Sequence, residues 1–490
     1  MKGILLNKKM KRTAIAVILA SCLVLSGCAK EKSRTEDVPV LLSAISVDFA
    51  DVIGPMKPLN GINNGPKAHA AFSEDGLEWE LDATELYQQC RIPFVRTHDM
   101  EYPDGSDRFI DVHCIFPDMS RDPEDPDAYH FAETDEYIQN ILASGAKVYY
   151  RLGESIAISE KDAKYQHKPE SFETWAEICA HIIAHYNSGW NNGYEYNIQY
   201  WQIWNEPDQK RQWNGTAEDY YALYKITARR IKEQFPDVLV GASAEASVTA
   251  ESLQTFLDWI RLDGEETPLD FLGWHIYTND PSKIVYRANM VRNVLDQNDF
   301  DGTQAFLDEW NYVDDWDHIE TTWEAIRSPS IAAFYGACMT VMQNEPVDGA
   351  MYYDGSLTGD YAFWCGLYDE KGNTLPGYYG FYAFSKLAEL GNQVRVTSQY
   401  DPSEQGVYIC AAAGETEQGI LITNTGPETV RFQMKLRSSF EQKSLIRADR
   451  DNPKEIVRES IDPGEKVILE LTSGEWIYIQ SINDMPVTQN

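Results

Sequence analysis

The chain has 490 residues, of which 42 are Lys or Arg and 77 are Asp or Glu, so its formal net charge at pH 7 is −35. Hydrophobic residues make up 43% of it, which is enough for a buried core and excludes a disordered, solvating chain. The excess of acids argues against a nucleic-acid partner, because phosphate binding needs clustered Lys and Arg, and the length indicates a large barrel or two to three domains.

The first 27 residues are predicted to be a lipoprotein signal peptide. Basic residues precede an apolar run, Ala14–Leu25, which is too short to span ~30 Å of hydrocarbon comfortably. The run ends in Leu25-Ser-Gly-Cys28, which resembles a bacterial lipobox and implies cleavage before Cys28 and lipid attachment to its sulfur. The alternative is an ordinary secretory signal with a chance Cys. We therefore expect residues 28–40 to be a tether that anchors an extracytoplasmic protein, at the cell surface or the periplasmic face.

Eight β-rich runs then alternate with amphipathic helical patterns, for example from Thr216 to Phe235 behind a capping box. The runs are Leu59–Asn63, Phe94–His98, Lys147–Gly153, Gln199–Glu206, Val238–Ser243, Phe271–Tyr277, Ala305–Asn311 and Gly349–Asp354. This number of repeats predicts an α/β fold of the (β/α)8 TIM barrel type over residues 41–390. A doubly wound open sheet is the alternative, but the Gly-rich phosphate turn that it usually carries is not evident.

The composition changes after Leu390-Gly391, where helix signals become rare and alternating runs become frequent. The strand candidates are Val407–Ala411, Gly419–Thr423, Val430–Leu436, Lys466–Leu471 and Trp476–Ile479. They predict a small C-terminal β-sandwich over residues 391–490. An alternative for Leu41–Phe49 is that it adds a strand to this sandwich. Beyond the signal region we expect mostly free buried thiols, with Cys90–Cys114 as the first pair to check for a disulfide.

Two carboxylates stand out because each ends an apolar, Trp-rich strand. Glu206 lies in an Asn-Glu-Pro turn after the fourth predicted strand, and Glu309 ends the seventh. The C-terminal ends of barrel strands converge on one face, and a glycosidic bond needs one carboxyl to protonate the leaving oxygen and one to attack. Surface acids are the alternative, but an unpaired charge in such strand ends would be costly. The aromatic residues expected to frame them against sugar rings are Trp201, Trp204, Trp310, Tyr312 and Trp316.

At this point the chain resembles the retaining glycoside hydrolases of clan A, and specifically family 39, which includes β-xylosidases and α-L-iduronidases. The likeness covers roughly residues 41–390 and the barrel-plus-sandwich layout. Besides the two glutamates, the matching motifs are Val95-Arg-Thr-His98, Tyr129-His-Phe131, Asp270-Phe-Leu-Gly-Trp-His-Ile-Tyr277 and the closing segment Gly366–Leu387.

The resemblance implies a role for each matching site residue. Glu206 would be the general acid/base and Glu309 the nucleophile of a double displacement. Asn205 would contact the sugar 2-hydroxyl. The other residues expected to bind substrate are His98, His275, Tyr277 and Trp310. No cofactor or metal is expected, and the partners are an oligosaccharide or polysaccharide and, through the lipid, a membrane.

Three positions depart from the family pattern. Asp99 stands where the family usually has Gly, and Asp308 stands where Thr commonly precedes the nucleophile. By strand alternation, Asp308 is expected to point away from Glu309. Arg151 stands where the family often has an acid, and we predict that it is a substrate-binding residue that could pair with an anionic sugar. The alternative is an Arg paired with a structural acid at the barrel rim.

The leading prediction is therefore a β-xylosidase-like glycosidase acting from chain ends on plant or host oligosaccharides. The alternatives are an endo-acting clan A glycanase or a uronidase, and a non-catalytic carbohydrate-binding lipoprotein. His181 and His185 lie one helical turn apart, as zinc ligands can, but Ile182 replaces the Glu of the zincin pattern. A helix packing face is the preferred interpretation for these two histidines.

Overall fold

The computed structural model describes residues 43–68, 71–72, 77–79, 81–103, 107–156, 168–243, 245–355, 364–437, 443–447, 457–461 and 467–482. The predicted signal peptide, the tether and Cys28 lie outside these residues. Within the described part of the chain, no helix is both long and apolar enough to cross a bilayer.

Eight parallel strands close into a barrel, which confirms the predicted fold class. In barrel order they are β2 (Gly61–Asn63), β5 (Phe94–Thr97), β6 (Lys147–Leu152), β7 (Tyr200–Ile203), β8 (Leu239–Ser243), β9 (Phe271–Tyr277), β10 (Gln304–Asn311) and β11 (Gly349–Tyr352). All eight coincide with predicted runs. A short hairpin, β3 (Ala71–Phe72) with β4 (Leu77–Glu78), follows the first of them.

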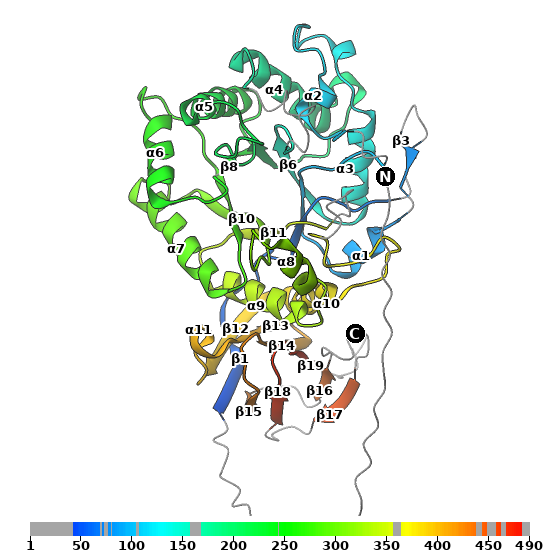
Figure 1. The fold of residues 1–490 in the computed structure, drawn as a ribbon, viewed down its shortest axis with the longest axis vertical. Coiled ribbons are helices and arrows are strands. Elements are labelled where there is room, and N and C mark those ends of the chain that lie inside the picture. The colour runs from blue at the N-terminus through cyan, green and yellow to red at the C-terminus, as the bar shows by residue number, and fades with distance from the viewer. Residues whose placement is uncertain are drawn as a thin grey trace, which may run out of the picture. The chain divides into compact units, whose positions relative to one another are not determined.

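Helices form the outer ring around the barrel (Figure 1). The α-helices are α1 (Thr84–Gln89), α2 (Val112–Ile115), α3 (Ala132–Ala143), α4 (Phe172–Ser188), α5 (Ala217–Gln234), α6 (Ala250–Ile260), α7 (Ser282–Gln297), α8 (Ile319–Ile326), α9 (Ile331–Asn344), α10 (Pro376–Ala388) and α11 (Pro402–Gln405), with 3₁₀ turns η1 (Pro126–Ala128) and η3 (Trp190–Asn192). The predicted capping box of α5 is present, because Thr216 and Asp219 each accept a hydrogen bond from the other's backbone N–H.

A second, mostly antiparallel sheet supplies the predicted β-sandwich. Its order is β17 (Val457–Ile461), β16 (Lys443–Arg447), β19 (Trp476–Ile482), β14 (Glu417–Asn424), β13 (Val407–Ala413), β12 (Asn392–Ser398), β1 (Ser43–Pro55), β15 (Val430–Arg437) and β18 (Val467–Leu471). The N-terminal strand β1 pairs with β12 and β15. The range 41–390 assigned to the barrel therefore includes one strand of the second sheet, and the alternative for Leu41–Phe49 is the arrangement observed.

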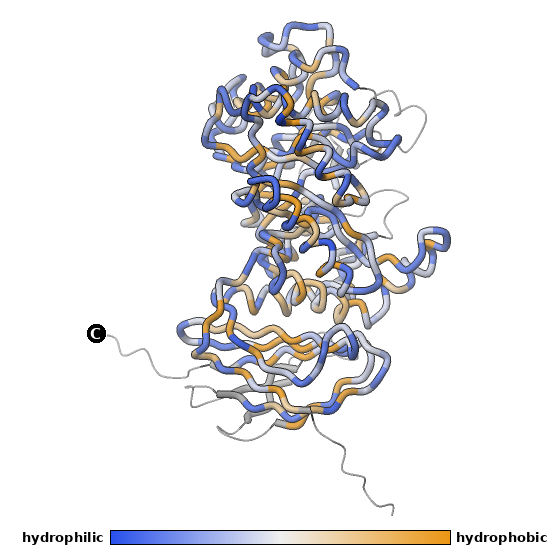
Figure 2. The backbone as a smooth tube through the Cα atoms, turned by 90° about the vertical axis from the view of Figure 1, so that its left-hand side faces the viewer, coloured by the Kyte–Doolittle hydropathy of each residue, from blue (hydrophilic) through white to orange (hydrophobic). Residues whose placement is uncertain are grey.

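Helices α9 and α10 join the barrel to the second sheet, where they pack on β13 and β14 (Figure 1). Nearly every residue of α9 is buried, which is the pattern of a helix covered on all sides. In Figure 2 hydrophobic colouring recurs in the strands beside these helices. The contact also includes a buried hydrogen bond of 2.9 Å from Gln343 Nε2 to Gln393 Oε1. A buried polar pair of this kind favours one orientation of the two surfaces.

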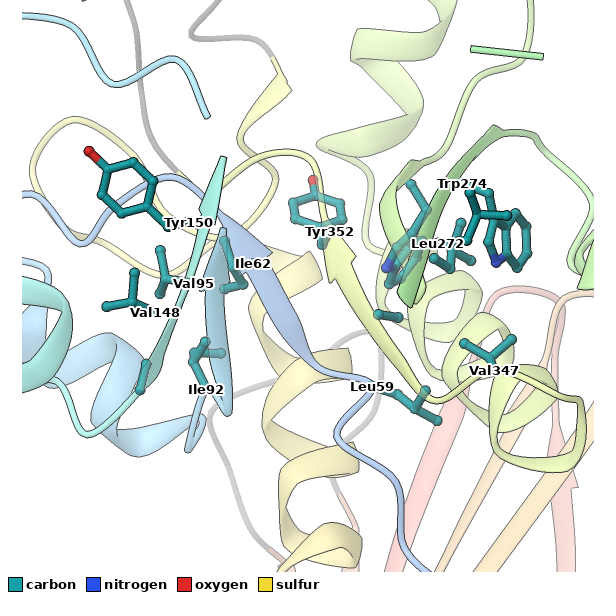
Figure 3. Packing of buried hydrophobic residues seen from close by; sticks show 14 of the residues in the cluster. Leu59, Ile62, Ile92, Val95, Val148, Tyr150, Leu272, Trp274, Val347 and Tyr352 are labelled. Carbon is teal, nitrogen blue, oxygen red and sulfur yellow. The ribbon is translucent and has the colours of Figure 1, made fainter. Parts of the chain in front are cut away.

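The barrel interior changes from aromatic to polar toward the C-terminal ends of the strands. Outward side chains such as Ile62, Val95 and Val148 pack under the helices (Figure 3). The inward cluster at the other end of the strands is Phe94, Tyr149, Phe271, Phe306 and Met351. Two residues further along three of these strands stand Arg96, Arg151 and Asp308, all fully buried. Because side chains in a strand alternate with period two, the polar residues lie above the aromatic layer on the inner face.

Candidate active site

A cavity of about 720 Å³ opens at the C-terminal ends of the barrel strands. Glu206 and Glu309 both line it, so the two strand ends singled out in the sequence meet in one site. The remaining lining residues are His98, Asp99, Glu101, Arg108, Ile156, Gln209, Arg211, Gln212, Ala246, Ser247, His275, Ile276, Tyr277, Arg287, Trp316, Tyr353 and Trp364. This is the face on which the active sites of such barrels are built.

Glu206 is held by an unusual backbone turn at the end of β7. Trp204 and Glu206 have φ of 69° and 39°, in the left-handed region that residues with a Cβ rarely adopt. Backbone strain of this kind is concentrated at functional sites, where it fixes the direction of a side chain. The backbone N–H of Glu206 also donates to Ser243 Oγ at 3.2 Å, which ties the turn to the end of β8.

Glu309 is almost fully buried and is surrounded by donors. Tyr277 Oη donates to its Oε1 at 2.5 Å, and Arg96 Nη1 donates to its Oε2 at 3.2 Å. His98 Nε2 also lies 3.2 Å from Oε2. Hydrogen bonds to the charged form of a carboxyl favour ionisation. The surroundings therefore suit a carboxylate rather than a carboxylic acid.

His275 connects the two glutamates. Its Nδ1 lies 2.8 Å from Glu206 Oε1 and 3.7 Å from Glu309 Oε2. A carboxylate oxygen of Glu206, a ring nitrogen of His275 and a carboxylate oxygen of Glu309 all lie within 4.8 Å of one another. Two carboxyls this close cannot both ionise without a large electrostatic cost unless a cation lies between them.

The environment drives the pKa values of the two carboxyls apart. Burial raises the pKa of Glu206, the hydrogen bond with His275 opposes the rise, and the charge of Glu309 adds to it, so the pKa lies above its ordinary value. Burial also acts to raise the pKa of Glu309, but His275, His98 and Arg96 outweigh it and hold that pKa well below its ordinary value. Divergent pKa values of neighbouring carboxyls are how one acid and one nucleophile coexist in a site.

The pKa of His275 itself is raised to about 10. Burial acts to lower it, but the carboxylates of Glu309, Asp308 and Glu206 favour the imidazolium more strongly. The buried site thus contains a cation that neutralises part of its acid cluster.

Asp308 corrects one expectation, because its side chain points into the barrel and does not turn away from the site. Between Phe306 and Glu309, β10 advances three residues while β9 advances only two, from Gly273 to His275. This bulge turns both Asp308 and Glu309 inward, whereas simple alternation would separate them. Asp308 Oδ2 accepts from Tyr149 Oη at 3.1 Å, and its Oδ1 lies 3.4 Å from His275 Nε2.

Gly273 makes room for the Asp308 carboxylate. A Cβ at this position would fall 2.1 Å from Asp308 Oδ2 and 2.3 Å from Gln202 Nε2. Any larger residue would therefore force Asp308 or Gln202 to shift, which favours glycine where the backbone of β9 approaches the buried polar layer.

Arg96 organises this layer, and its role was missed from the sequence. Its guanidinium donates to Gln202 Oε1 at 2.8 Å, Asn63 Oδ1 at 2.9 Å and Asn205 Oδ1 at 2.6 Å, in addition to Glu309. One sequence pattern could have identified it. On several strands a polar residue stands two positions after an aromatic residue that points inward. Arg96 follows Phe94 in this way, and Gln202 follows Tyr200.

The structure brings most of the predicted substrate-binding residues together. His98, His275 and Tyr277 line the cavity. Asn205 is fully buried beside Glu206, and its Nδ2 has no hydrogen-bond partner among the described residues. A buried amide with an unused donor can bind an acceptor on a ligand.

Trp310 does not line the cavity, so its prediction as a substrate-binding residue is wrong. It follows Glu309 on the opposite face of β10 and packs outward under the helices, with its ring stacked on Phe381 at 6.1 Å between centroids and edge-on to Tyr335 at 5.8 Å. Alternation after the bulge turns Trp310 away from the barrel axis. Of the aromatic residues predicted to frame the site, Trp316 lines the cavity, where it is joined by Trp364 and Tyr353.

Arg151 does not line the cavity either, which contradicts its prediction as a substrate-binding residue. Its Nη2 donates to Asp111 Oδ1 at 2.8 Å, to Ser155 Oγ at 3.1 Å and to the carbonyl of His98. The side chain is fully buried. The alternative interpretation, an Arg paired with a structural acid at the barrel rim, is the one observed.

Other clusters of potential metal ligands among the described residues already contain direct contacts. His113 Nδ1 lies 2.5 Å from Glu154, and its Nε2 lies 3.4 Å from Asp107. His181 and His185 contact different partners: Nε2 of His181 lies 3.5 Å from Glu124, and Nε2 of His185 lies 3.0 Å from Asp135. These contacts agree with a helix packing face for the two α4 histidines. The cysteines at 90, 114, 179, 338, 365 and 410 are all free thiols, so Cys90 and Cys114 are not paired.

Comparison with known proteins links this geometry to a family. The chain is 24% identical over 207 residues to a protein named beta-xylosidase from Geobacillus stearothermophilus. The alignment covers 41% of this chain and 39% of that protein. The beta-xylosidase of Caldicellulosiruptor saccharolyticus is 30% identical over 162 residues, covering 31% of this chain and 32% of its own. The matches thus span well under half of both relatives.

The architecture is shared with solved structures over most of the chain. A structure described as a glucosidase from Croceicoccus marinus superposes with a TM-score of 0.71 and 21% identity, over 90% of this chain and 99% of that one. This likeness concerns the fold alone. Residues 67–348, more than half of the chain, match the sequence profile described as "Glycosyl hydrolases family 39", and the protein belongs to that family.

Proposed function

We propose that the protein is a retaining glycoside hydrolase in which Glu206 is the general acid/base and Glu309 the nucleophile. The observation that carries the proposal is the closeness of the two carboxyls, within 4.8 Å between nearest oxygens, combined with opposite shifts of their pKa values. Retaining enzymes have carboxyls about 5–5.5 Å apart, whereas inverting enzymes separate them by about 6.5–9.5 Å to admit a water molecule.

The proposed reaction has two displacements. In the first, Glu309 attacks the anomeric carbon while Glu206 gives its proton to the departing glycosidic oxygen. The bond to the leaving group breaks and an ester to Glu309 forms. In the second, Glu206, now ionised, takes a proton from water, whose oxygen attacks the anomeric carbon and releases Glu309 as a carboxylate. Esterification removes the negative charge of Glu309, which favours the ionised state of Glu206 that the second step needs.

The residues around the carboxyls have separate tasks in this scheme. Tyr277, Arg96 and His98 orient Glu309 and keep it ionised through the contacts described above. The free Nδ2 of Asn205 is available for the sugar 2-hydroxyl, a contact that strengthens as the transition state develops. Asp99, which lines the cavity, offers carboxylate oxygens to further hydroxyls.

For the substrate, we propose exo action of the β-xylosidase type on short oligosaccharides. Support comes from the family assignment and from the names of the two relatives, both of which are beta-xylosidases. A panel of 4-nitrophenyl glycosides, including β-xyloside, β-glucoside, α-L-arabinoside and a uronide, tests the sugar. Proton NMR of the first product formed tests the mechanism, because a retaining enzyme releases the sugar with the same anomeric configuration as the substrate.

Trapping provides a second test of the residue roles. A 2-deoxy-2-fluoro glycoside of the preferred sugar should accumulate as an ester on the peptide that contains Glu309. Labelling of another residue, or inversion of the product, would reject the assignment. If the protein binds glycans but releases no product from any glycoside or oligosaccharide, a non-catalytic carbohydrate-binding protein becomes the better description.

We also propose that lipid on Cys28 anchors the protein to a membrane on the extracytoplasmic side. The support is the lipobox-like sequence and the apolar run before it. Metabolic labelling with a radioactive fatty acid should mark the wild-type protein and not Cys28→Ser. Equal labelling of both would reject Cys28 as the lipidated residue.

A further inference from the structure

The two walls of the cavity differ in charge. One wall comes from the segments that follow β5, β10 and β11. It contains two acids, Asp99 and Glu101, and one arginine, Arg108, whose Nη2 lies 3.9 Å from Glu101 Oε2. The other comes from the segments that follow β7, β8 and β9, and besides Glu206 it contains Arg211 and Arg287. In a chain with 77 acidic and 42 basic residues, two arginines on one wall of the cavity call for an explanation.

Arg287, on α7, differs from three other arginines at or near the site. Arg96, Arg108 and Arg151 each lie within 4.0 Å of an acidic side chain. For Arg287 the hydrogen bond observed is from Nη1 to the backbone carbonyl of Val248 at 2.8 Å. Within the described part of the chain it forms no ion pair, and burial lowers its pKa. A half-buried guanidinium that is oriented by a carbonyl but has no counter-ion is prepared to bind an anion.

Among the residues that the structure describes, the neighbouring polar groups leave this position open to a ligand. Gln212 lines the same wall, and its buried Oε1 has no hydrogen-bond partner among the described residues. Asp208, an acid close to this wall, uses its carboxylate oxygens to accept from the Ala246 N–H at 2.9 Å and from Gln209 Nε2 at 3.0 Å. These contacts tie the Asp208 carboxylate to the segment that follows β8 and to its own neighbour Gln209.

The wall that contains Arg287 is also the wall of Glu206. In the proposed reaction Glu206 protonates the leaving oxygen, so the leaving group must lie on its side of the cavity. The sugar that is attacked then lies toward Glu309 and the wall of Asp99 and Glu101. The acids there outnumber Arg108 and would repel a negative charge.

We propose that the leaving-group side of the cavity, which Arg211 also lines, binds an anionic substituent, a carboxylate or a sulfate, through Arg287. The preferred substrate is then a neutral sugar linked to an acidic sugar. This inference rests on the proposed role of Glu206. The sequence-based expectation was that Arg151 could pair with an anionic sugar. The present inference assigns anion specificity to Arg287, on the leaving-group side of the cavity.

Pairs of disaccharides provide the test. Each pair has the neutral glycone that the nitrophenyl panel selects, linked either to glucose or to glucuronic acid at the reducing end. We expect kcat/KM to favour the acidic member by about tenfold or more at low salt, as for a charge-assisted hydrogen bond in a partly buried site. The ratio should fall toward one in Arg287→Gln, recover in part in Arg287→Lys, and decrease with added salt.

Arg431→Gln, on the second sheet, is the matched control and should keep the wild-type ratio. Glucose 6-sulfate as the reducing-end sugar distinguishes sulfate from carboxylate recognition. Equal kcat/KM for neutral and acidic members, or a preference that Arg287→Gln retains, would overturn the inference while the glycosidase proposal survives.

Binding separates the two proposals if no substrate is cleaved. Calorimetric titration of the wild-type protein compares methyl β-glucuronide and methyl β-glucoside 6-sulfate with the neutral methyl β-glucoside. Preferential binding of an anionic ligand that is lost in Arg287→Gln would support the subsite although the catalytic proposal had failed. No preference for either anion would reject the subsite.

Discussion

The imidazole of His275 lies 2.8 Å from the carboxyl of Glu206, and this contact couples the protonation of the two groups. An imidazolium at that distance favours the ionised form of Glu206, whereas burial and the charge of Glu309 favour the protonated form. The second effect is larger. Activity therefore depends on a balance that pH and single substitutions can shift.

The rate should show a bell-shaped dependence on pH. In the proposed mechanism the reactive form has Glu309 ionised and Glu206 protonated. Because the pKa of Glu309 lies well below the ordinary value of 4.5 and that of Glu206 lies above it, the acid limb of kcat/KM should fall below pH 4.5 and the alkaline limb above it. An acid limb well above pH 4.5 would contradict an ionised, donor-stabilised Glu309.

Replacement of His275 by Gln should move both limbs to higher pH. The substitution removes a cation that lowers the pKa of both carboxyls, so each needs a higher pH to ionise. We expect kcat/KM to fall as well, because His275 lines the cavity. His318→Gln, at an exposed histidine paired with Asp315, is the control and should reproduce the wild-type profile.

Glu206→Gln should have an effect that depends on the leaving group. Without a proton donor, substrates with poor leaving groups should lose about 10²–10⁴-fold in kcat, whereas activated aryl glycosides should lose far less. Comparison of an alkyl or disaccharide substrate with the 4-nitrophenyl glycoside measures the difference. Equal losses on both would count against Glu206 as the acid, and Glu218→Gln, on the exposed first turn of α5, controls for the substitution itself.

Tyr277→Phe removes the 2.5 Å hydrogen bond to Glu309. A hydrogen bond to a charged group contributes about 1.5–3 kcal/mol, so we expect kcat/KM to fall by about 10–100-fold. The pKa of Glu309 should rise, which moves the acid limb of the pH profile upward. A variant with reduced activity but an unmoved acid limb would show that Tyr277 acts on the substrate and not on Glu309.

Gly273→Ala tests the buried layer beneath the carboxyls. The added methyl group would fall 2.1 Å from Asp308 Oδ2, so Asp308 and Gln202 must shift. We expect a loss of about 1–3 kcal/mol in the free energy of unfolding, as for overpacking, with a lower kcat. Gly302→Ala, where no atom lies within 4 Å of the new Cβ, is the control. Wild-type stability in Gly273→Ala would mean that the polar layer is not tightly packed.

Arg151→Met should destabilise the fold. Removing one partner of a fully buried ion pair leaves Asp111 uncompensated and costs about 3–5 kcal/mol of unfolding free energy. Arg395→Met breaks an exposed pair with Asp51 and should cost about 1 kcal/mol or less. Denaturant unfolding measures the loss in unfolding free energy of each variant relative to the wild type. A similar small loss in both variants would show that Arg151 is not a structural residue.

Local sequence patterns determined the elements of this protein and the two glutamates. Period-two apolar runs and capping signals depend on neighbouring residues only, so all eight barrel strands and the start of α5 could be predicted. Glu206 and Glu309 could be selected as candidate site residues because a charged residue at the end of an apolar strand seldom has a purely structural role. The placement of β1 in the second sheet was open, because a strand's pairing partner can lie hundreds of residues away.

Tertiary structure alone decided which side chains face the site. Strand alternation predicts direction only while the register is regular. Asp308 follows inward Phe306 by two residues, and the bulge in β10 turns Glu309 inward beside it. Arg151 and Arg287 have the same charge, and the sequence alone does not distinguish them. In the structure Asp111 neutralises Arg151, whereas Arg287 lines the cavity without an ion pair among the described residues. The sequence determines the charge of a side chain. Whether that charge is available to a ligand depends on which other side chains lie beside it in the folded protein.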